Sequence, residues 1–157
     1  MKQNKMKILL TGANGYVGKR LLPVLLEEGH EVVLLTRFSK VPVIKKYQKK
    51  VSYIHADLMN PGSLSVIPKE IDAVYYLVHS MDSRTKRLVS AEKKAAQNFI
   101  ERVTQTKAKQ IIFLSGIGHD KKLSHHLKAR HKVEEILQES KIPTTILRCG
   151  IIIGSGS

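Results

Sequence analysis

The sequence is poor in the residues that mark secreted and membrane proteins. Its 157 residues include no tryptophan and only one cysteine, Cys149. A single cysteine cannot form a disulfide within the chain, which fits a reducing compartment. No apolar run approaches the roughly 18 residues that a membrane-spanning helix needs. The first residues lead directly into an apolar strand pattern and leave no room for a signal peptide. We therefore expect a cytoplasmic protein with no membrane partner, in which Cys149 is a small buried residue.

Acidic residues are also scarce, and the resulting positive charge makes nucleic-acid binding a function to consider. The chain has 27 Lys and Arg against 13 Asp and Glu, a net charge of +14. Such a field attracts polyanions. The basic residues are spread along the chain, however, and aromatic side chains, which stack on bases, make up only 5% of it. The pattern therefore favours a solvated, lysine-rich surface over nucleic-acid binding as the main function.

A glycine-rich turn near the start of the chain carries the strongest functional signal. The apolar segment 6–11 has the pattern of a parallel strand buried on both faces, and an amphipathic helix begins at Tyr16. Unpaired N–H groups and the dipole at such a helix start bind anions, for example a pyrophosphate, although the same pattern also fits a purely structural turn. Side chains at the first two glycines would hold a phosphate away, and one at the third would push the helix off the strand. The residues assigned to this site are Gly12, Asn14, Gly15, Tyr16, Val17 and Gly18.

Strand and helix patterns alternate along the rest of the chain. This order predicts parallel strands joined by right-handed crossovers, hence a doubly wound α/β sheet, the Rossmann fold, with about six strands in a single domain spanning residues 1–157. Ligands bind such a sheet at the carboxyl ends of its strands. The expected strands are 6–11, 31–36, 51–55, 73–78, 111–115 and 144–147, and the later helices are 84–106 and 123–137.

Arg37 follows the second expected strand, where NAD-preferring sites of this fold place an acidic residue for the ribose hydroxyls. A carboxylate there would repel a 2′-phosphate, whereas an arginine can pair with it and stack on the adenine. The sequence therefore predicts NADP as the cofactor, with NAD as the alternative. The alternative is that Arg37 is an ordinary surface arginine.

Residues at several strand ends together resemble a known family. They are similar to the atypical, extended-like branch of the short-chain dehydrogenase/reductase superfamily, the NmrA-like NAD(P)-binding proteins. The resemblance covers essentially the whole chain. The segments that carry it are Thr-Gly-x-x-Gly-Tyr-x-Gly at 11–18, Thr-Arg at 36–37, Ala-Asp-Leu at 56–58, Tyr-Tyr-Leu-Val-His-Ser at 75–80, Phe-Leu-Ser-Gly at 113–116 and Leu-Arg-Cys-Gly at 147–150.

The resemblance implies a role for each end of a dinucleotide site. By analogy with the family, Asp57 contacts the adenine amino group and Leu58 packs on the ring, while Val78 and His79 lie along the nicotinamide ribose. Asp57 has an alternative role as a cap for the helical turn expected after it.

The chain departs from the family at the expected catalytic positions. Enzymes of this superfamily use a Ser or Thr after the fifth strand and a Tyr-x-x-x-Lys pair on the next helix, whose tyrosine transfers a proton. Aligned back from Glu134, that pair becomes His126 and Arg130. His126 can still act as a general acid near neutral pH, and Arg130 can still hold a ribose. The catalytic hydroxyl falls at Gly116, and Ser115, one residue early, is directed to the opposite face of its strand.

Histidines and chain length give two further expectations. The histidines at 119, 125, 126 and 131 have no cysteine among them and no clear ligand spacing, so no metal site is expected. Members of the family continue past the sixth strand into a final strand and most of the substrate pocket. We therefore expect that part to be missing here, whether the chain is a fragment or a naturally shortened protein.

Two functions fit these observations. One is an NADP-dependent oxidoreductase with Ser115, His126 and Arg130 as a degenerate catalytic set. The other is a non-catalytic NADP-binding redox sensor or partner-binding module, in which the cofactor shifts a conformational equilibrium. The sequence identifies a dinucleotide as the ligand, names no substrate, and is compatible with an oligomer.

Overall fold

The computed structural model describes residues 4–37, 45–79, 87–118 and 124–155 of the chain. Within these ranges strands alternate with α-helices and with short 3-10 helices. In chain order the elements are β1 (Lys7–Thr11), α1 (Tyr16–Glu27), β2 (Glu31–Thr36), η1 (Lys45–Lys50), β3 (Val51–His55), η2 (Pro61–Val66), β4 (Ala73–Tyr76), α2 (Arg87–Val103), β5 (Gln110–Gly116), α3 (His125–Gln138) and β6 (Thr144–Cys149).

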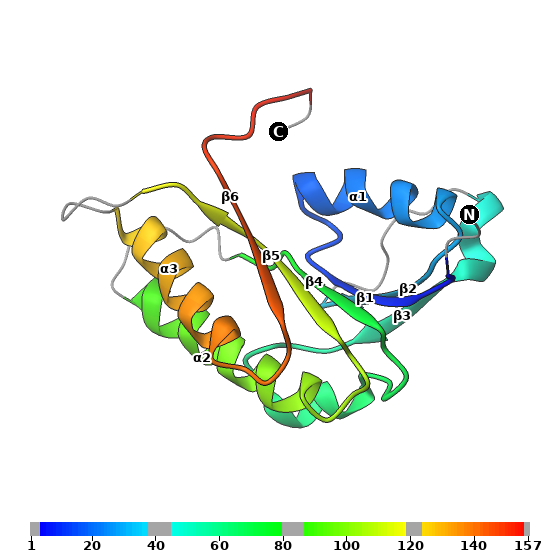
Figure 1. The fold of residues 1–157 in the computed structure, drawn as a ribbon, viewed down its shortest axis with the longest axis horizontal. Helices are drawn as coiled ribbons and strands as arrows, with labels where there is room; N and C mark the ends of the chain where they lie inside the picture. Colours follow the sequence, from blue (N-terminus) through cyan, green and yellow to red (C-terminus); the bar gives the residue numbers. More distant parts are fainter. Residues whose placement is uncertain (1–3, 38–44, 80–86, 119–123, 156–157) are drawn as a thin grey trace.

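The strands form one sheet in the order β3-β2-β1-β4-β5-β6 (Figure 1). Every neighbouring pair is parallel. The chain begins at the centre of the sheet with β1, runs outward to β3, returns to the centre at β4 and runs outward again to β6. This is the doubly wound arrangement, so the predicted Rossmann fold is confirmed.

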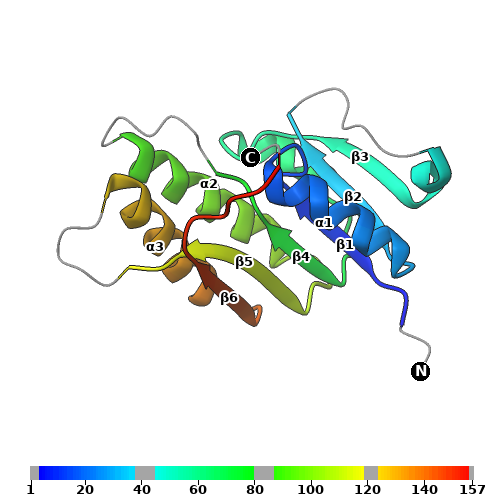
Figure 2. The ribbon, with the colours of Figure 1, turned by 90° about the horizontal axis from the view of Figure 1, so that it is seen from above.

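Helices cover the two faces of the sheet to different extents (Figure 2). Helix α1 packs over β1 and β2 on one face, whereas α2 and α3 lie side by side on the other. Successive residues of β1 point to opposite faces, so Leu9 enters the core beneath α2 and α3 while Ile8 and Leu10 enter the core beneath α1. Phe99 of α2 and Phe113 of β5 are fully buried in the first of these cores. The unbroken apolar run of β1 is therefore explained by burial on both sides.

Element boundaries differ from the predictions in a few places. Strand β4 ends at Tyr76 rather than at 78, because the amide of Leu77 leaves the ladder and donates to the Thr11 hydroxyl at 3.0 Å. Strands β5 and β6 are each longer than expected. Helix α3 begins at His125, where the Ser124 hydroxyl accepts a hydrogen bond from the Leu127 amide and caps the first turn. The prediction for 84–86 and for 123 lies outside the described residues.

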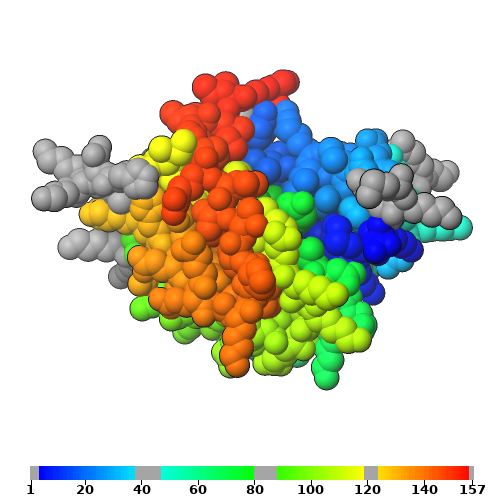
Figure 3. Space-filling model, in the orientation of Figure 1, coloured from blue at the N-terminus to red at the C-terminus, as the bar shows by residue number. Residues whose placement is uncertain are grey.

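The segment after β6 turns back across the carboxyl edge of the sheet to the start of α1. Arg20 donates a hydrogen bond to the Ser155 carbonyl, and its guanidinium lies 3.7 Å from the centre of the Tyr16 ring. Figure 3 shows the C-terminal atoms resting against the first turn of α1. The C-terminal segment thus meets the start of α1 above the carboxyl ends of the strands.

Among the described residues, no helix is both long enough and apolar enough to span a membrane.

Candidate functional site

The glycine-rich turn is pressed against the chain leaving β4. Gly12 has a φ of +70°, and a Cβ added to it would lie 2.6 Å from the Leu77 carbonyl oxygen and 3.0 Å from the Val78 nitrogen. A Cβ on Gly18 would lie 2.7 Å from the Cα of Ala13. Because these neighbours are backbone atoms, neither position has room for a side chain. Gly12 therefore permits the turn, and Gly18 lets α1 start directly behind it.

The start of α1 is suited to an anion. Gly15 is the N-cap residue, so no side chain caps the first turn, and this turn contains no acidic residue. Its N–H groups have no i−4 carbonyl to bind, and the helix dipole adds partial positive charge. A diphosphate can therefore approach the backbone closely, with no carboxylate to repel it and no Cβ in the way.

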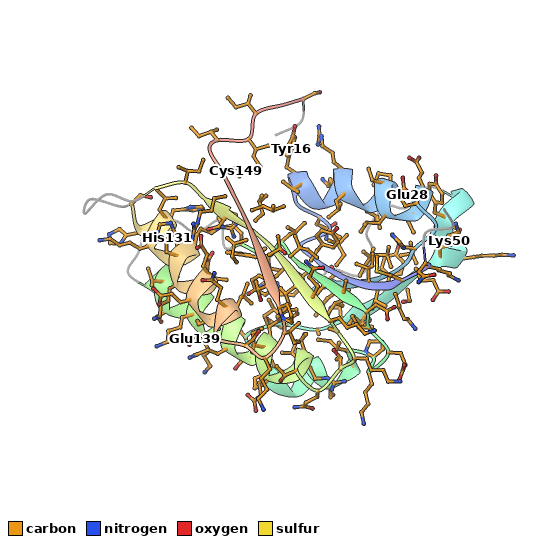
Figure 4. All side chains as sticks on the ribbon, in the orientation of Figure 1. Tyr16, Glu28, Lys50, His131, Glu139 and Cys149 are labelled. Carbon is orange, nitrogen blue, oxygen red and sulfur yellow. The ribbon has the colours of Figure 1, made fainter. Side chains whose placement is uncertain are left out.

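A cavity of about 1010 Å³ follows the carboxyl edge of the sheet. It is large for a small-molecule site and matches an extended ligand better than a compact one. Tyr16 at the start of α1 and Cys149 at the end of β6 both line it and are labelled in Figure 4. The residues proposed from the sequence for cofactor binding or catalysis all line this cavity: Gly12, Asn14, Gly15, Tyr16, Val17, Gly18, Arg37, Asp57, Leu58, Val78, His79, Ser115, His126 and Arg130.

One end of the cavity lies at the carboxyl ends of β2 and β3. Arg37 is exposed there, and its carbonyl oxygen lies 2.7 Å from the His55 Nε2 atom. The Asp57 Oδ1 atom accepts a hydrogen bond from the Met59 amide at 2.9 Å, so the carboxylate is oriented by the turn that it begins. The turn leads into η2, whose N-cap is Asn60 and not Asp57. Leu58 is buried beside Asp57 and forms an apolar wall.

The other end of the cavity holds two histidines in direct contact. The Nε2 atoms of His79 and His126 are 3.2 Å apart, and the two rings meet edge to face. The Nδ1 atom of His79 lies 3.4 Å from a carboxylate oxygen of Glu92, which is buried on α2. Burial lowers the pKa of His126, and the nearby His79 and Arg130 lower it further. His126 is therefore set to be neutral at neutral pH.

Arg130 and Ser115 lie beneath the histidine pair and make different contacts. Arg130 is buried, donates to the Leu114 carbonyl and lies over the Phe113 ring, with 4.8 Å to the ring centre. Its Nη1 atom has no hydrogen-bond partner among the described residues. The Ser115 hydroxyl is buried near the Glu134 carboxylate and forms no well-aligned hydrogen bond within the described chain. The structure therefore brings His79, His126 and Arg130 together and directs Ser115 toward α3.

Gly116, which the sequence resemblance aligns with the family's catalytic hydroxyl, lines the same cavity. A Cβ there would meet the end of the Leu127 side chain. No hydroxyl thus stands at the end of β5 on the cavity side. Within the described ranges, no group of three His, Cys, Asp or Glu side chains is placed to hold a metal ion together. His119 lies outside those ranges.

A family model described as NAD(P)H-binding matches residues 12–155 of the chain. The chain belongs to the NAD(P)H-binding family. Sequence relatives include eugenol synthase 2 of Clarkia breweri, 33% identical over 102 residues that make up 60% of this chain and 33% of the relative. An isoflavone reductase homolog of Lupinus albus is 24% identical over 96% of this chain and 51% of its own length. The predicted membership of the atypical short-chain dehydrogenase/reductase group is confirmed.

Solved structures place the NAD(P)H-binding domain among proteins of the same fold. The Bordetella bronchiseptica enzyme WbmG, solved in complex with NAD, superposes with a TM-score of 0.78 at 17% identity, covering 92% of this chain and 53% of that one. Pen from Bacillus thuringiensis superposes with the same TM-score of 0.78 at 19% identity, covering 98% and 52%. The chain spans about half the length of these structures, and a third to a half of the curated relatives described above.

Glu92 lines the cavity beside the histidines, and its place there was not predicted from the sequence. The signal was present, because Glu92 lies four residues after Leu88 and four before Ala96, on the apolar stripe of α2. A buried carboxylate inside such a stripe must be satisfied by a hydrogen-bonding or charged partner. Its partner, His79, comes from a distant part of the chain, which periodicity alone does not reveal.

Proposed function

We propose that this chain is the cofactor-binding domain of an NADP-preferring, oxidoreductase-like protein. The proposal is supported by one continuous cavity with an anion-binding helix start in its middle, an exposed arginine at one end and a histidine pair at the other. A dinucleotide has the same order of groups: a diphosphate between an adenosine and a nicotinamide riboside. In this arrangement Asp57 and Leu58 hold the adenine, and Val78 and His79 lie beside the nicotinamide ribose.

The preference for NADP rests on Arg37. Its side chain is exposed at the end of β2, where a 2′-phosphate would lie if the diphosphate binds at Gly15. One charge-assisted contact of about 1.5 to 3 kcal/mol gives a tenfold to hundredfold preference over NAD.

Chemistry at the other end would be carried by His126. A bound nicotinamide supplies or accepts the hydride, and His126 exchanges the accompanying proton with the substrate oxygen in place of the family's tyrosine. Arg130 supports this end by placing a buried positive charge beside the histidine pair. Ser115 has no direct part in this scheme, because its hydroxyl is buried toward Glu134.

A thermal-shift titration with NADPH, NADH and neither tests the proposal. At one hundred times its dissociation constant, NADPH adds about 2.7 kcal/mol to the free energy of unfolding. For a domain of this size that raises the midpoint by roughly 5 to 11 °C. The shift should appear at lower concentrations of NADPH than of NADH. No shift with either nucleotide would refute cofactor binding.

Arg37→Asp should lower the affinity for NADPH and reverse the ratio of NADPH to NADH affinity. Lys94→Asp, on the exposed face of α2, is the matched control because it changes the net charge by the same amount at a side chain that does not line the cavity. It should leave the ratio unchanged. Equal effects of the two substitutions would show that general charge, and not a 2′-phosphate contact, sets the preference.

A non-catalytic NADP sensor is the second candidate, favoured by the absence of a hydroxyl at Gly116 and of a tyrosine at His126. Hydride transfer to a panel of quinones, aldehydes and ketones separates the two. Turnover that His126→Ala abolishes supports the enzyme. Tight NADPH binding with no turnover supports the sensor.

A further inference from the structure

Three side chains at the histidine end of the cavity form a continuous chain of polar contacts. Glu92 comes from α2, His79 from the segment after β4 and His126 from the first turn of α3. The Glu92 carboxylate lies 3.4 Å from Nδ1 of His79, and Nε2 of His79 lies 3.2 Å from Nε2 of His126. Glu92 is buried, whereas both imidazoles are only half-buried and all three residues line the cavity. The chain of contacts thus runs from the interior to the ligand space.

The carboxylate fixes the hydrogens of both rings. An ionised Glu92 only accepts, so Nδ1 of His79 carries the proton that faces it. In the neutral state Nε2 of His79 is then an acceptor, and the facing Nε2 of His126 must be the donor. This leaves Nδ1 of His126 as the unprotonated nitrogen of the pair. The neutral cluster therefore ends in a base.

The same contacts decide where an added proton resides. Two imidazolium rings at this distance repel each other, so the pair takes up its first proton well before its second. Glu92 stabilises the positive charge on His79, whereas Arg130 on α3 opposes it on His126. Tyr76 on β4 is fully buried beside Glu92 and stays neutral, because burial and the Glu92 charge both raise its pKa. Of the other histidines on α3, His125 is exposed and His131 is directed to the Gly116 carbonyl.

We infer that Glu92, His79 and His126 form a proton relay, in which His126 exchanges a proton with the oxygen of an alcohol or carbonyl substrate and His79, held by Glu92, carries the resulting charge. The inference rests on the proposed function, since that function places the reacting oxygen at this end of the cavity. His126 is the catalytic residue of the relay. His79 and Glu92 are positioning residues that act through it.

The protons and electrons balance in both directions. In alcohol oxidation the O–H proton moves to Nδ1 of His126, and the proton on its Nε2 moves to Nε2 of His79. The hydride leaves the carbon for the oxidised nicotinamide, and the carbon–oxygen bond becomes a double bond. His79 is then an imidazolium paired with Glu92. In carbonyl reduction the same atoms move in reverse, and no further oxidant or reductant is needed.

Imidazole titration by NMR tests the relay in the chain without cofactor. In the unsubstituted chain we expect the two rings to titrate as a coupled pair in two separated steps. Glu92→Gln should lower the apparent pKa of the first step by about one unit, because an opposite charge at this distance is removed. Glu139→Gln, at the exposed end of α3 (Figure 4), is the matched control and should leave both steps in place. His126→Gln should leave a single step, because the coupled partner ring is removed.

The outcomes distinguish the relay from the proposed function. Unchanged titration in Glu92→Gln, or an equal change in Glu139→Gln, would overturn the relay. Stoichiometric binding of added Zn²⁺ between the two rings would also overturn it, in favour of a metal site. A thermal shift with NADPH is measured on the same samples and should persist in Glu92→Gln. If NADPH causes no thermal shift in the unsubstituted chain, the proposed function is refuted, whatever the titration shows.

Discussion

Gly12→Ala tests how far the glycine-rich turn depends on its close approach to β4. The residue has a φ of +70°, which costs an alanine about 1 to 2 kcal/mol. Its Cβ would also lie 2.6 Å from the Leu77 carbonyl oxygen. Since the obstructing atoms belong to the backbone, relieving the clash must move the turn or the end of β4, at about 1 to 3 kcal/mol. We expect a total loss of about 2 to 5 kcal/mol, a large share of the roughly 5 to 15 kcal/mol of a typical domain.

Gly29→Ala and Gly150→Ala separate the two contributions. Gly29, just after α1, has a φ of +91° and nothing within 4 Å of an added Cβ, so it carries the backbone strain alone. Gly150 has neither a positive φ nor a close neighbour, so Gly150→Ala should hardly change the free energy of unfolding. The difference between the losses at Gly12 and Gly29 therefore measures the steric part.

Urea unfolding of the three variants gives the free energies, and an NADPH thermal shift on each gives the effect on binding. Gly12→Ala should lose most of the shift, because displacing the turn displaces the anion site. Gly29→Ala should keep it, since that glycine is at the far end of α1. A Gly12→Ala variant no less stable than Gly29→Ala, with normal NADPH binding, would refute this account of the turn.

Two further predictions concern the end of the sheet near β6. Burial raises the pKa of Glu134, but Arg148 at 2.6 Å and the nearby Ser115 hydroxyl outweigh it, so the folded pKa lies below the usual 4.5. Its contribution to stability is then complete above about pH 4.5 and is lost as pH falls through the depressed pKa, so Glu134→Gln should unfold with a shallower acid dependence in urea titrations. Cys149 is half-buried in the wall of the cavity, and saturating NADPH should slow its alkylation, followed by mass spectrometry. An unchanged rate would place the cofactor away from β6.

Local patterns were sufficient to predict most of the fold. The start of α1 could be predicted because glycines end the apolar run of the first strand and a stripe of apolar residues at helical spacing follows them. The observed helix begins at Tyr16, as predicted. The end of β4 could not be read in this way. It depends on the Thr11 hydroxyl, which binds the Leu77 amide and the Tyr75 carbonyl across the sheet. A strand end fixed by a side chain 66 residues away leaves no mark in the strand itself.

The candidate site shows the same division. Strand-end residues such as Arg37, Asp57 and His79 could be located from the sequence, since parallel strands bring their carboxyl ends to one edge. Strand alternation also gave the inward orientation of Ser115. The contact between His79 and His126 could not be predicted, because it depends on how α3 packs beside the chain leaving β4. The role of Glu92 could be recognised only from its contact with His79 in the folded structure.

The strand order of the sheet affects how this domain folds and unfolds. Strand β1 pairs with β2, which follows closely, and with β4, whose Ala73 faces Ile8 across 65 positions of the chain. Its central ladder therefore closes a long loop, a slow and entropically costly step. The cavity spans both halves and exists only after that step. A dinucleotide bound in the cavity would contact both halves of the sheet and so stabilise the pairing of β1 with β4. It would then slow unfolding and protect the whole domain from proteolysis, and not only the residues that it touches.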